Sequence, residues 1–305
     1  MTIERYIQAR FANPFRPGIK VNLYRDYEYR ATARCIAETA TDAVECVMVG
    51  DSYFMTHLGR DSTQLNEETA AQALDLLPRL IAELRAEMDR NEHGIVPPML
   101  MADIPDGLST DQVHDVIDRY KANGAEIVKL EFGSLDDLWM VDVIGDAGLV
   151  PAIHLGYMPQ KNSNQTYGVS ALEVASYRRM IDAAHEAGAR CVIFERLTEV
   201  ANVLLTKYCL ALGMLPYSIF SGRAPLGGQS INAWDSTVIA PVKSIFFPPT
   251  ALITREQVAE HYKEPLIAER LGKLLKMALV NVFPPSPRNS LDLDDCIELI
   301  EEAAP

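Results

Sequence analysis

Cysteine is scarce in this chain of 305 residues, with five in all: Cys35, Cys46, Cys191, Cys209 and Cys296. The number is odd, and no two of them stand in the Cys-x-x-Cys spacing of zinc sites and redox motifs. This pattern argues against a structural zinc site and against a disulfide-stabilised secreted scaffold. We therefore expect reduced thiols, most of them buried.

Positive charge is also in short supply. The chain has 28 Lys and Arg against 42 Asp and Glu, which gives a formal net charge of −14. A surface of this sign repels phosphate backbones and anionic lipid headgroups, so we expect no nucleic-acid or membrane partner. The 48% hydrophobic and 23% charged content is ordinary for a globular protein and excludes disordered and collagen-like classes.

Long apolar runs are absent. The longest uncharged stretch near the middle, 208–222, has 15 residues and contains Gly213 and Pro216, whereas a spanning helix needs about 20 apolar residues. The first residues, Met-Thr-Ile-Glu-Arg, lack the basic start and apolar centre of a signal peptide. We therefore expect a cytoplasmic protein.

Short apolar runs do recur along the chain. Near-continuous apolar segments, rather than alternating ones, are typical of strands buried on both faces of a parallel sheet. We predict strands at 19–23, 44–50, 99–102, 126–130, 150–155, 191–194 and 215–220, with a weak eighth at 230–233.

Longer amphipathic segments separate these strands. Apolar residues at three- and four-residue spacing predict helices at 67–90, 111–123, 134–147, 171–187 and 198–212. Ser109 or Thr110 can cap one helix and Ser134 another, and a glycine follows four of the helices, at Gly124, Gly148, Gly188 and Gly213. Strand, helix and glycine repeat at roughly 25–40 residues, which indicates right-handed βαβ units.

The number of units favours a closed (β/α)8 barrel over an open doubly wound sheet of about five or six strands. We predict a single domain over 1–305, with the barrel at about 18–250 and a C-terminal helical extension at about 251–305. Helical patterns at 255–282 and 291–301 flank a proline-rich stop at 284–287 in that extension, where we expect a cap or a subunit contact.

Ionisable residues stand at or near the ends of five successive predicted strands: Asp51, Asp103, Glu131, His154 and Glu195. A single carboxylate there is more often a helix cap or an ion-pair partner than a functional group. Five in succession favour function, because the carboxyl ends of barrel strands carry the active site. For the same reason we favour a ligand or substrate role for the histidine over that of a core residue.

Three of these acids suit a magnesium ion. Carboxylates gathered at a rim repel one another and would raise each other's pKa without a cation. Asp51, Asp103 and Glu131 form an oxygen-only set, which Mg²⁺ prefers. Lys129 shares a strand face with Glu131 and either contacts substrate or forms an internal ion pair, and both readings stay open.

A glycine-rich loop at 221–229 follows the seventh predicted strand, where barrels often bind phosphate. Its spacing is neither a dinucleotide fingerprint nor a P-loop. A plain tight turn is the default interpretation.

Five sequence blocks, in order, resemble the signature of the ketopantoate hydroxymethyltransferase family, whose fold is a (β/α)8 barrel of the phosphoenolpyruvate mutase/isocitrate lyase type. The resemblance extends over roughly 18–284, nearly the whole chain. The blocks are Val-Met-Val-Gly-Asp-Ser at 47–52, Leu-Gly-Arg-Asp-Ser-Thr at 58–63, Met-Ala-Asp-Ile-Pro at 101–105, Val-Lys-Leu-Glu at 128–131 and His-Leu-Gly-Tyr-Met-Pro-Gln at 154–160.

The resemblance implies a reaction and roles for particular residues. The family moves a one-carbon unit from 5,10-methylenetetrahydrofolate onto the 2-oxo acid 3-methyl-2-oxobutanoate, for pantothenate synthesis, and usually forms homo-oligomers. The implied roles are Mg²⁺ binding by Asp51, Asp103 and Glu131; substrate binding by Ser52, Lys129 and His154 together with the metal ligands Asp51 and Asp103; and proton abstraction by Glu195.

Simple chemistry agrees with these implications. A 2-oxo acid can chelate Mg²⁺, which polarises its carbonyl group and stabilises the enolate left when the adjacent carbon loses a proton. Glu195 would take that proton. Arg196 follows directly, and we expect strand alternation to aim its side chain away from the pocket.

The chain departs from the family pattern at several rim positions, where larger residues replace glycine or other small ones. These positions are Tyr53, Phe54, Phe132, Ile153, Ser218 and Phe220. Larger side chains would reshape the space for acceptor or pteridine. We therefore expect a divergent hydroxymethyltransferase that acts on 3-methyl-2-oxobutanoate or a related 2-oxo acid. A divergent enzyme that uses another 2-oxo acid in a specialised biosynthetic pathway is kept as the alternative form of this expectation.

Three alternatives stay open. A Mg²⁺-dependent carbon–carbon lyase or aldolase of the same barrel type would act on a 2-oxo acid without folate. A second kind of aldolase would use Lys129 as a Schiff base. A non-catalytic barrel is the third, and it is disfavoured because clustered acids without a cation cost stability.

Overall fold

The computed structural model describes residues 3–14, 16, 18–23, 43–50, 67–90, 97–158, 167–219, 221–222, 224–232 and 276. Apart from Lys276, which is helical, the predicted C-terminal extension lies outside the described residues. The helices expected at 255–282 and 291–301 therefore stay predictions.

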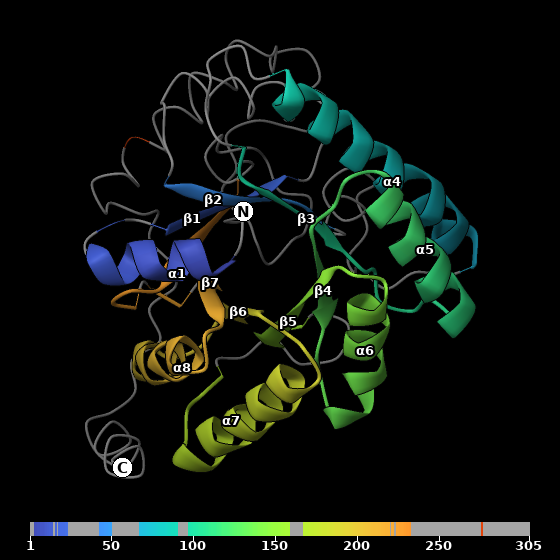
Figure 1. Ribbon diagram of the computed structural model, residues 1–305. Helices are drawn as coiled ribbons and strands as arrows, with labels where there is room; N and C mark the ends of the chain where they lie inside the picture. The colour runs from blue at the N-terminus through green and yellow to red at the C-terminus, as the bar shows by residue number, and fades with distance from the viewer. Residues whose placement is uncertain are drawn as a thin grey trace, which may run out of the picture. The chain divides into compact units, whose positions relative to one another are not determined.

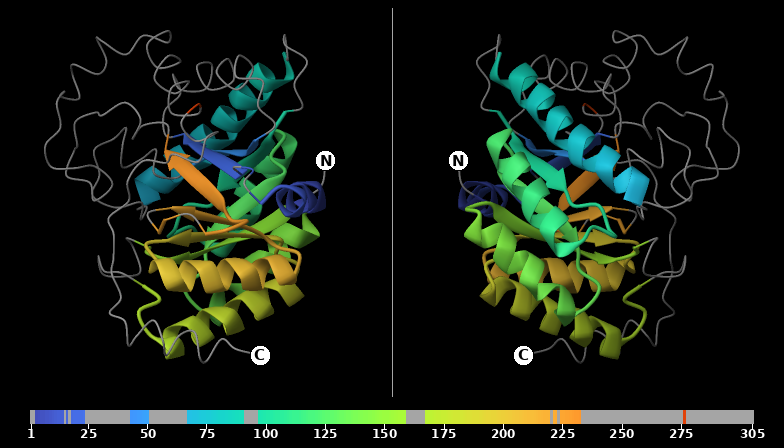
Figure 2. Two further views of the ribbon diagram at one scale, coloured as in Figure 1. Left: turned by 90° about the vertical axis from the view of Figure 1, so that its left-hand side faces the viewer. Right: turned by 90° about the vertical axis from the view of Figure 1, so that its right-hand side faces the viewer.

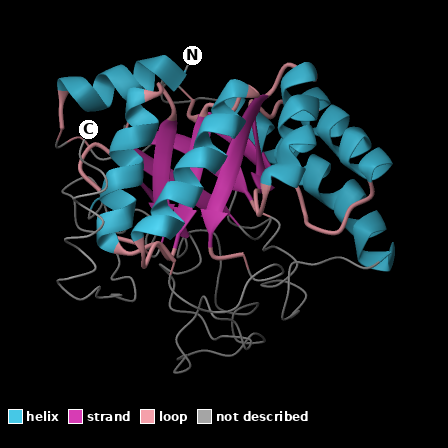
Figure 3. Cartoon of the chain, turned by 90° about the horizontal axis from the view of Figure 1, so that it is seen from below, coloured by secondary structure: helices cyan, strands magenta, loops and turns pink. Residues whose placement is uncertain are grey.

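Eight strands follow one another in chain order around a closed barrel, and neighbouring strands run in the same direction (Figure 3). The predicted (β/α)8 barrel is confirmed, including its weak eighth strand. The strands are β1 (Gly18–Leu23), β2 (Val44–Val49), β3 (Met99–Asp103), β4 (Ile127–Glu131), β5 (Val150–Gly156), β6 (Cys191–Glu195), β7 (Leu215–Ile219) and β8 (Gly228–Asn232).

All five predicted helices of the barrel region are present, with ends that move by a few residues (Figure 1). They are α4 (Glu67–Asp89), α5 (Thr110–Ala122), α6 (Leu138–Asp146) after a 3-10 turn at Leu135–Asp137, α7 (Ala171–Glu186) and α8 (Glu199–Ala211). A further helix, α1 (Ile3–Ala12), was not predicted. None of the described helices has the length and apolar character needed to cross a membrane.

Contacts within the chain divide it into two compact units. The first consists of Met1–Gly18, Ile127–Ser230 and Pro285–Pro305, and the second of Ile19–Glu126 and Ile231–Pro284. The first unit holds α1, β4 to β7 and α6 to α8, and the second holds most of β1, β2 and β3 with α4 and α5. The single domain over 1–305 stays a prediction.

In the first unit, α7 packs against both α6 and α8, and α8 also packs on β7. Both views of Figure 2 show α7 and α8 side by side. Side-chain caps fix where these helices begin. Ser170 Oγ accepts from the N–H of Glu173, and Thr198 Oγ1 accepts from the N–H of Ala201. Each cap satisfies a donor that the first turn leaves unpaired, so the helix that follows β6 has a defined start close to the end of that strand.

In the second unit, α4 and α5 pack side by side. Arg85 of α4 pairs with Glu126 at 2.8 Å, and the same carboxylate accepts from the N–H of Leu100 in β3 at 3.0 Å. Tyr120 of α5 is fully buried and donates its hydroxyl to the carbonyl oxygen of Asp103 at 2.7 Å. These contacts fix both ends of β3 against the helix layer.

The described cysteines are expected to resist alkylation in the folded protein. Cys46, Cys191 and Cys209 are buried thiols outside any disulfide, and burial raises the pKa of the Cys209 thiol. Since only the thiolate reacts, iodoacetamide at pH 8 should label these three in urea but not in buffer, as peptide mass mapping can measure. Labelling of Cys209 in buffer at the rate of a free thiol would contradict this packing.

Candidate active site

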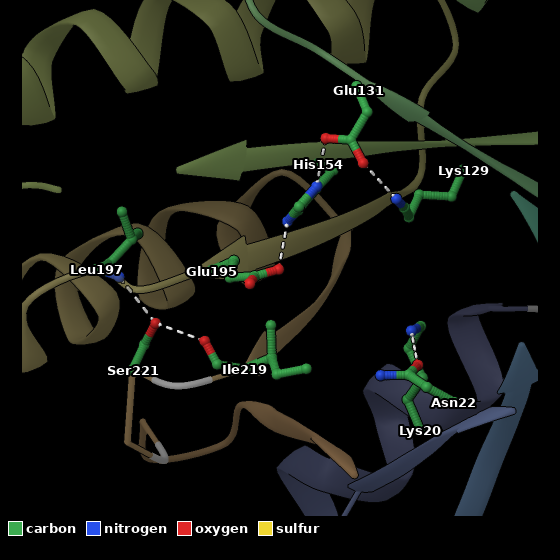
Figure 4. Close-up of polar contacts among 9 residues, drawn as sticks. All are labelled: Lys20, Asn22, Lys129, Glu131, His154, Glu195, Leu197, Ile219 and Ser221. Atoms are coloured by element: carbon green, nitrogen blue, oxygen red, sulfur yellow. Dashed lines mark hydrogen bonds and ion pairs between the residues drawn. The ribbon is translucent and has the colours of Figure 1, made fainter. Parts of the chain in front are cut away.

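Four buried side chains of the first unit form a continuous chain of polar contacts, which we call the polar cluster (Figure 4). Lys129 Nζ lies 2.6 Å from Glu131 Oε1, and Glu131 Oε2 lies 2.6 Å from Nδ1 of His154. On the other side of the imidazole, Nε2 lies 3.3 Å from Oε2 of Glu195. Two acids and two basic groups thus alternate across three strands.

Strand register explains why these four side chains meet. Lys129 and Glu131 are two residues apart on β4, so they lie on one face, as predicted. Glu131 is the register partner of His154 on β5, and Gly156 of β5 is the partner of Glu195 on β6. The ends of three parallel strands therefore bring the cluster together.

The electrostatics of the cluster correct one sequence-based expectation. Burial alone would raise the pKa of Glu131, but the charges of His154 and Lys129 hold that pKa well below its ordinary value. Burial alone would lower the pKa of His154, but the charge of Glu131, together with hydrogen bonding of the ring to the carboxylates of Glu131 and Glu195, raises it to about 9. The rise in pKa expected for clustered carboxylates does not occur at Glu131, because the positive charges of Lys129 and His154 lie next to its carboxylate.

Glu195 has an oxygen that the rest of the cluster does not use. Its Oε2 faces His154, while Oε1 is buried and has no hydrogen-bond partner among the described residues. A buried carboxylate oxygen without a donor is costly. That cost is relieved when a ligand brings a proton or a donor to the oxygen, which is what a general base requires.

The backbone around Glu195 is held by close packing with β5. Gly156 has a φ of 102°, and the N–H of the next residue, Tyr157, donates to the carbonyl oxygen of Glu195 at 3.0 Å. A Cβ atom at Gly156 would overlap that carbonyl oxygen. Only glycine fits both the conformation and the space.

Replacing Gly156 with alanine should therefore displace Glu195. We expect Gly156→Ala to lower the free energy of unfolding by about 1–3 kcal/mol from backbone strain alone, with a further loss from the overlap, as measured in urea. Gly188→Ala is the matched control, because Gly188 has a φ of 108° and nothing within 4 Å of its Cβ position. Equal losses in the two variants would show that the approach of Gly156 to Glu195 is unimportant.

The segment after Glu195 is tied to the glycine-rich loop (Figure 4). Ser221 Oγ accepts from the N–H of Leu197 at 2.9 Å and donates to the carbonyl oxygen of Ile219 at 3.0 Å. Asn202 Nδ2 donates to the carbonyl oxygens of Ser221 and Gly222. These bonds favour the tight-turn interpretation, because the hydroxyl that could meet a phosphate is already engaged.

Arg196 lies just outside the regular backbone of β6, and the prediction that its side chain points away from the pocket stays a prediction. β6 ends at Glu195, and Arg196 has a left-handed φ of 58°. Its guanidinium carbon lies 5.3 Å from the ring centroid of Tyr157. Burial, followed by the charge of Glu195, raises the pKa of Tyr157 to about 12, while the charge of Arg196 opposes that rise. Both charges therefore act on one phenol.

Only one of the predicted site residues in the second unit is among the described residues. Asp103 is buried at the end of β3, as expected. Sequence reasoning missed a buried polar pair on β1, in which Lys20 Nζ donates to Asn22 Oδ1 (Figure 4). The available signal was two polar residues at alternate positions of an apolar strand.

Several sequence-predicted residues lie outside the described residues: Asp51, Ser52, Tyr53, Phe54 and Phe220. Phe132 and Ile153 are described and fully buried, and Ser218 is buried with its hydroxyl donated to the carbonyl oxygen of Gly222 at 2.7 Å. The effect of these larger residues on the space for the acceptor or the pteridine stays a prediction.

The predicted magnesium ligands fit the ion by their chemistry. Asp103 and Glu131 each end a strand with a buried carboxylate. Each oxygen of Glu131 contacts one nitrogen partner, and a carboxylate has about four lone-pair sites, so these two contacts are compatible with a role as a metal ligand. No group of three or more metal-binding side chains is found within the described ranges, and the third predicted ligand, Asp51, lies outside them.

Comparison with known proteins decides the family. The sequence model of ketopantoate hydroxymethyltransferase matches residues 25–209, which is more than half of the chain. The chain belongs to this family. It is 30% identical over 188 residues to the 3-methyl-2-oxobutanoate hydroxymethyltransferase of Corynebacterium diphtheriae, across 60% of this chain and 64% of the relative. The corresponding enzyme of Bdellovibrio bacteriovorus is 28% identical over 185 residues, across 58% of this chain and 63% of the relative.

The chain thus spans just under two thirds of the length of these two family members. Among solved structures, it is similar to the carboxyl transferase domain of Rhizobium etli pyruvate carboxylase with 3-hydroxypyruvate, with 11% identity and a TM-score of 0.52. That likeness covers 95% of this chain and 52% of the other. At this identity it shows the fold alone.

Proposed function

We propose that this family member transfers a hydroxymethyl group from 5,10-methylenetetrahydrofolate to a 2-oxo acid, through an enolate that Glu195 generates. The observation that carries the proposal is the buried Oε1 of Glu195, which lacks a partner among the described residues while His154 occupies the other oxygen. The relatives' names support the reaction class.

The residues of the chain would act in a defined order. Glu195 Oε1 takes a proton from the carbon next to the keto group, and the electron pair of that C–H bond becomes the enolate. Both carbon–nitrogen bonds of the donor's methylene group break: the enolate carbon replaces one nitrogen, and the oxygen of a water molecule replaces the other. The proton held by Glu195 and one proton of the water go to the two nitrogens, so that tetrahydrofolate and the hydroxymethylated acid leave.

The polar cluster would hold the base in position during these steps. Lys129 and Glu131 fix Nδ1 of His154, and the ring then orients Oε2 of Glu195. In the bound complex we assign substrate contacts to Lys129 and His154, with Ser52 as a further contact.

A magnesium ion is part of the proposal. Asp51, Asp103 and Glu131 would hold the ion, and Asp51 and Asp103 would interact with the substrate through the ion. When bound, the ion supplies Lewis-acid polarisation of the keto oxygen. We also propose that the protein forms a homo-oligomer and is located in the cytoplasm.

The Schiff-base alternative is disfavoured by the geometry of Lys129. A Schiff base requires a neutral amine that can attack a carbonyl carbon. Nζ of Lys129 instead lies 2.6 Å from a carboxylate oxygen in a buried pair, which favours the ammonium form. Borohydride should therefore trap no adduct with a 2-oxo acid.

The direct test is product formation from 3-methyl-2-oxobutanoate and related 2-oxo acids, with 5,10-methylenetetrahydrofolate and Mg²⁺, followed by mass spectrometry. The proposal predicts a product heavier by one CH2O unit that requires both folate and the divalent ion. A product or cleavage reaction that is unaffected by omitting folate would favour the lyase or aldolase instead.

A further inference from the structure

The eighth strand holds a buried hydroxyl group that the protein does not pair. Ser230 of β8 is 5% exposed, and its Oγ has no hydrogen-bond partner among the described residues. A buried hydroxyl group in this state is costly. As for Oε1 of Glu195, the cost is relieved when a bound molecule supplies the missing partner.

Strand register places this hydroxyl group on the face of the sheet that carries the proposed base. Glu195 and Ile219, both drawn in Figure 4, are register partners on β6 and β7, and Tyr217 is the partner of Gly228 on β8. Side chains alternate along a strand, so Ser230, two residues after Gly228, lies on the face of Glu195. The contacts agree, because a Cβ atom at Gly228 would meet the ring of Tyr217. All five residues belong to the first compact unit.

The opposite face of β7 and β8 is satisfied within the protein. Ser218 and Gln229 are register partners there, and Ser218 Oγ lies 3.4 Å from Gln229 Oε1. The same hydroxyl group donates to the carbonyl oxygen of Gly222 at 2.7 Å. Of the two serines, the one on the face of Glu195 is therefore the one whose hydroxyl group lacks a protein partner.

The row of side chains from β6 to β8 is polar at both ends and apolar between them. Glu195 has a carboxylate oxygen without a partner, Ile219 is apolar, and Ser230 has the unpaired hydroxyl group. Neighbouring strands lie about 4.8 Å apart, so the ends of the row are about 10 Å apart at the backbone, a distance that two side chains and a small acid can bridge together. β7 and β8 contain no charged residue. The hydroxyl group therefore suits a neutral group that both donates and accepts, rather than a carboxylate.

We propose that Ser230 binds the hydroxyl group that the acceptor gains in the reaction, through a hydrogen bond to that oxygen in the hydroxymethylated product. The inference rests on the proposed function, because it assigns a position to the group which that function adds. The reacting carbon of the product lies at Glu195, its alkyl substituents at Ile219 and its new hydroxyl group at Ser230. The serine forms and breaks no covalent bond, so its role is binding.

Two acids that differ in this one group test the inference. 4-Hydroxy-3,3-dimethyl-2-oxobutanoate is the product expected from 3-methyl-2-oxobutanoate, and 3,3-dimethyl-2-oxobutanoate lacks only its hydroxyl group. Isothermal titration calorimetry with Mg²⁺ and without folate measures both dissociation constants. Since only one acid can pair the buried hydroxyl group of the protein, we expect that acid to bind about tenfold more tightly.

Two serine variants locate the effect. Ser230→Ala should bring the ratio of the two dissociation constants close to one, mainly by weakening the binding of the hydroxylated acid. Its midpoint in urea without either acid should be unchanged or higher, because the hydroxyl group that is removed has no protein partner. Ser218→Ala is the matched control on the opposite face. It should keep the ratio and lower the urea midpoint, because it loses the bond to Gly222.

The outcomes separate this inference from the function on which it rests. Equal affinity for the two acids in the unmodified protein, binding of neither, or a ratio that survives Ser230→Ala overturns the role of Ser230. If hydroxymethyl transfer still occurs in those cases, the proposed function stands. Absence of transfer to every 2-oxo acid together with binding of neither acid overturns both. The ratio in the unmodified protein decides the question even where Ser230→Ala fails to fold.

Discussion

Glu195→Gln should lose about 10²- to 10⁴-fold in the rate of hydroxymethyl transfer, the range that a well-placed general base contributes. Glutamine keeps the size of the side chain and can still contact His154, but its amide cannot take a proton from carbon. Because the substrate is bound by other groups, the loss should appear in kcat much more than in KM.

A variant of the same kind nearby provides the control for Glu195→Gln. Glu199→Gln alters an exposed carboxyl group on the first turn of α8, four residues further along the chain, and should retain transfer activity. Circular dichroism should show both variants folded. Transfer by Glu195→Gln at more than about a tenth of the original rate would be too fast for loss of the base.

Glu131→Gln should lower the free energy of unfolding by about 3–5 kcal/mol, which is the usual cost of removing one partner from a buried ion pair. The acid lies 2.6 Å from both Lys129 and His154 and is buried with them. Without its charge, two basic groups are left close together away from water. Urea denaturation measures the change, and transfer activity should fall with it.

Two comparisons show whether the burial of charge causes the loss of stability in Glu131→Gln. Glu126→Gln removes a half-exposed acid that pairs with Arg85 at 2.8 Å, and should cost at most about 1 kcal/mol. The double variant Lys129→Met/Glu131→Leu removes both charges and should be more stable than Glu131→Gln. A Glu131→Gln protein as stable as the original would mean that the polar cluster does not depend on this acid.

The strands could be predicted from the sequence because both of their faces are buried, which produces continuous apolar runs. Their ends were less accurate, for a physical reason. Asp103, Glu131 and Glu195 were each expected to follow a strand, whereas each is its last residue. A charged residue interrupts the apolar pattern of a sequence. A paired or buried charge does not interrupt the hydrogen bonding between neighbouring strands, so the strand continues to that residue.

Helix α1 was missed for a related reason. Its buried residues include Arg10, which the pattern counts as polar. That side chain is buried because its guanidinium donates to the carbonyl oxygens of Pro216 and Leu226 and lies over the ring of Tyr217. Such long-range partners cannot be seen in a local pattern.

For the site, the sequence indicated which residues would be present but not how they would pair. The positions of Glu131, His154 and Glu195 followed from strand ends, whereas their contacts depend on the register between β4, β5 and β6. The left-handed backbone of Arg196 is a single φ angle that no sequence pattern announces. Register and single backbone angles are set by the assembled sheet, so no residue-by-residue rule could give them.

The central claim is that the polar cluster makes an enolate from a 2-oxo acid. The most direct measurement is therefore proton NMR of 3-methyl-2-oxobutanoate, 2-oxopentanoate and 2-oxopentanedioate in D2O with Mg²⁺ and no folate. We expect enzyme-dependent loss of the proton signal from the carbon next to the keto group for at least one acid, and no such loss with Glu195→Gln. An unchanged signal for all three acids, or equal loss with Glu195→Gln, would contradict it.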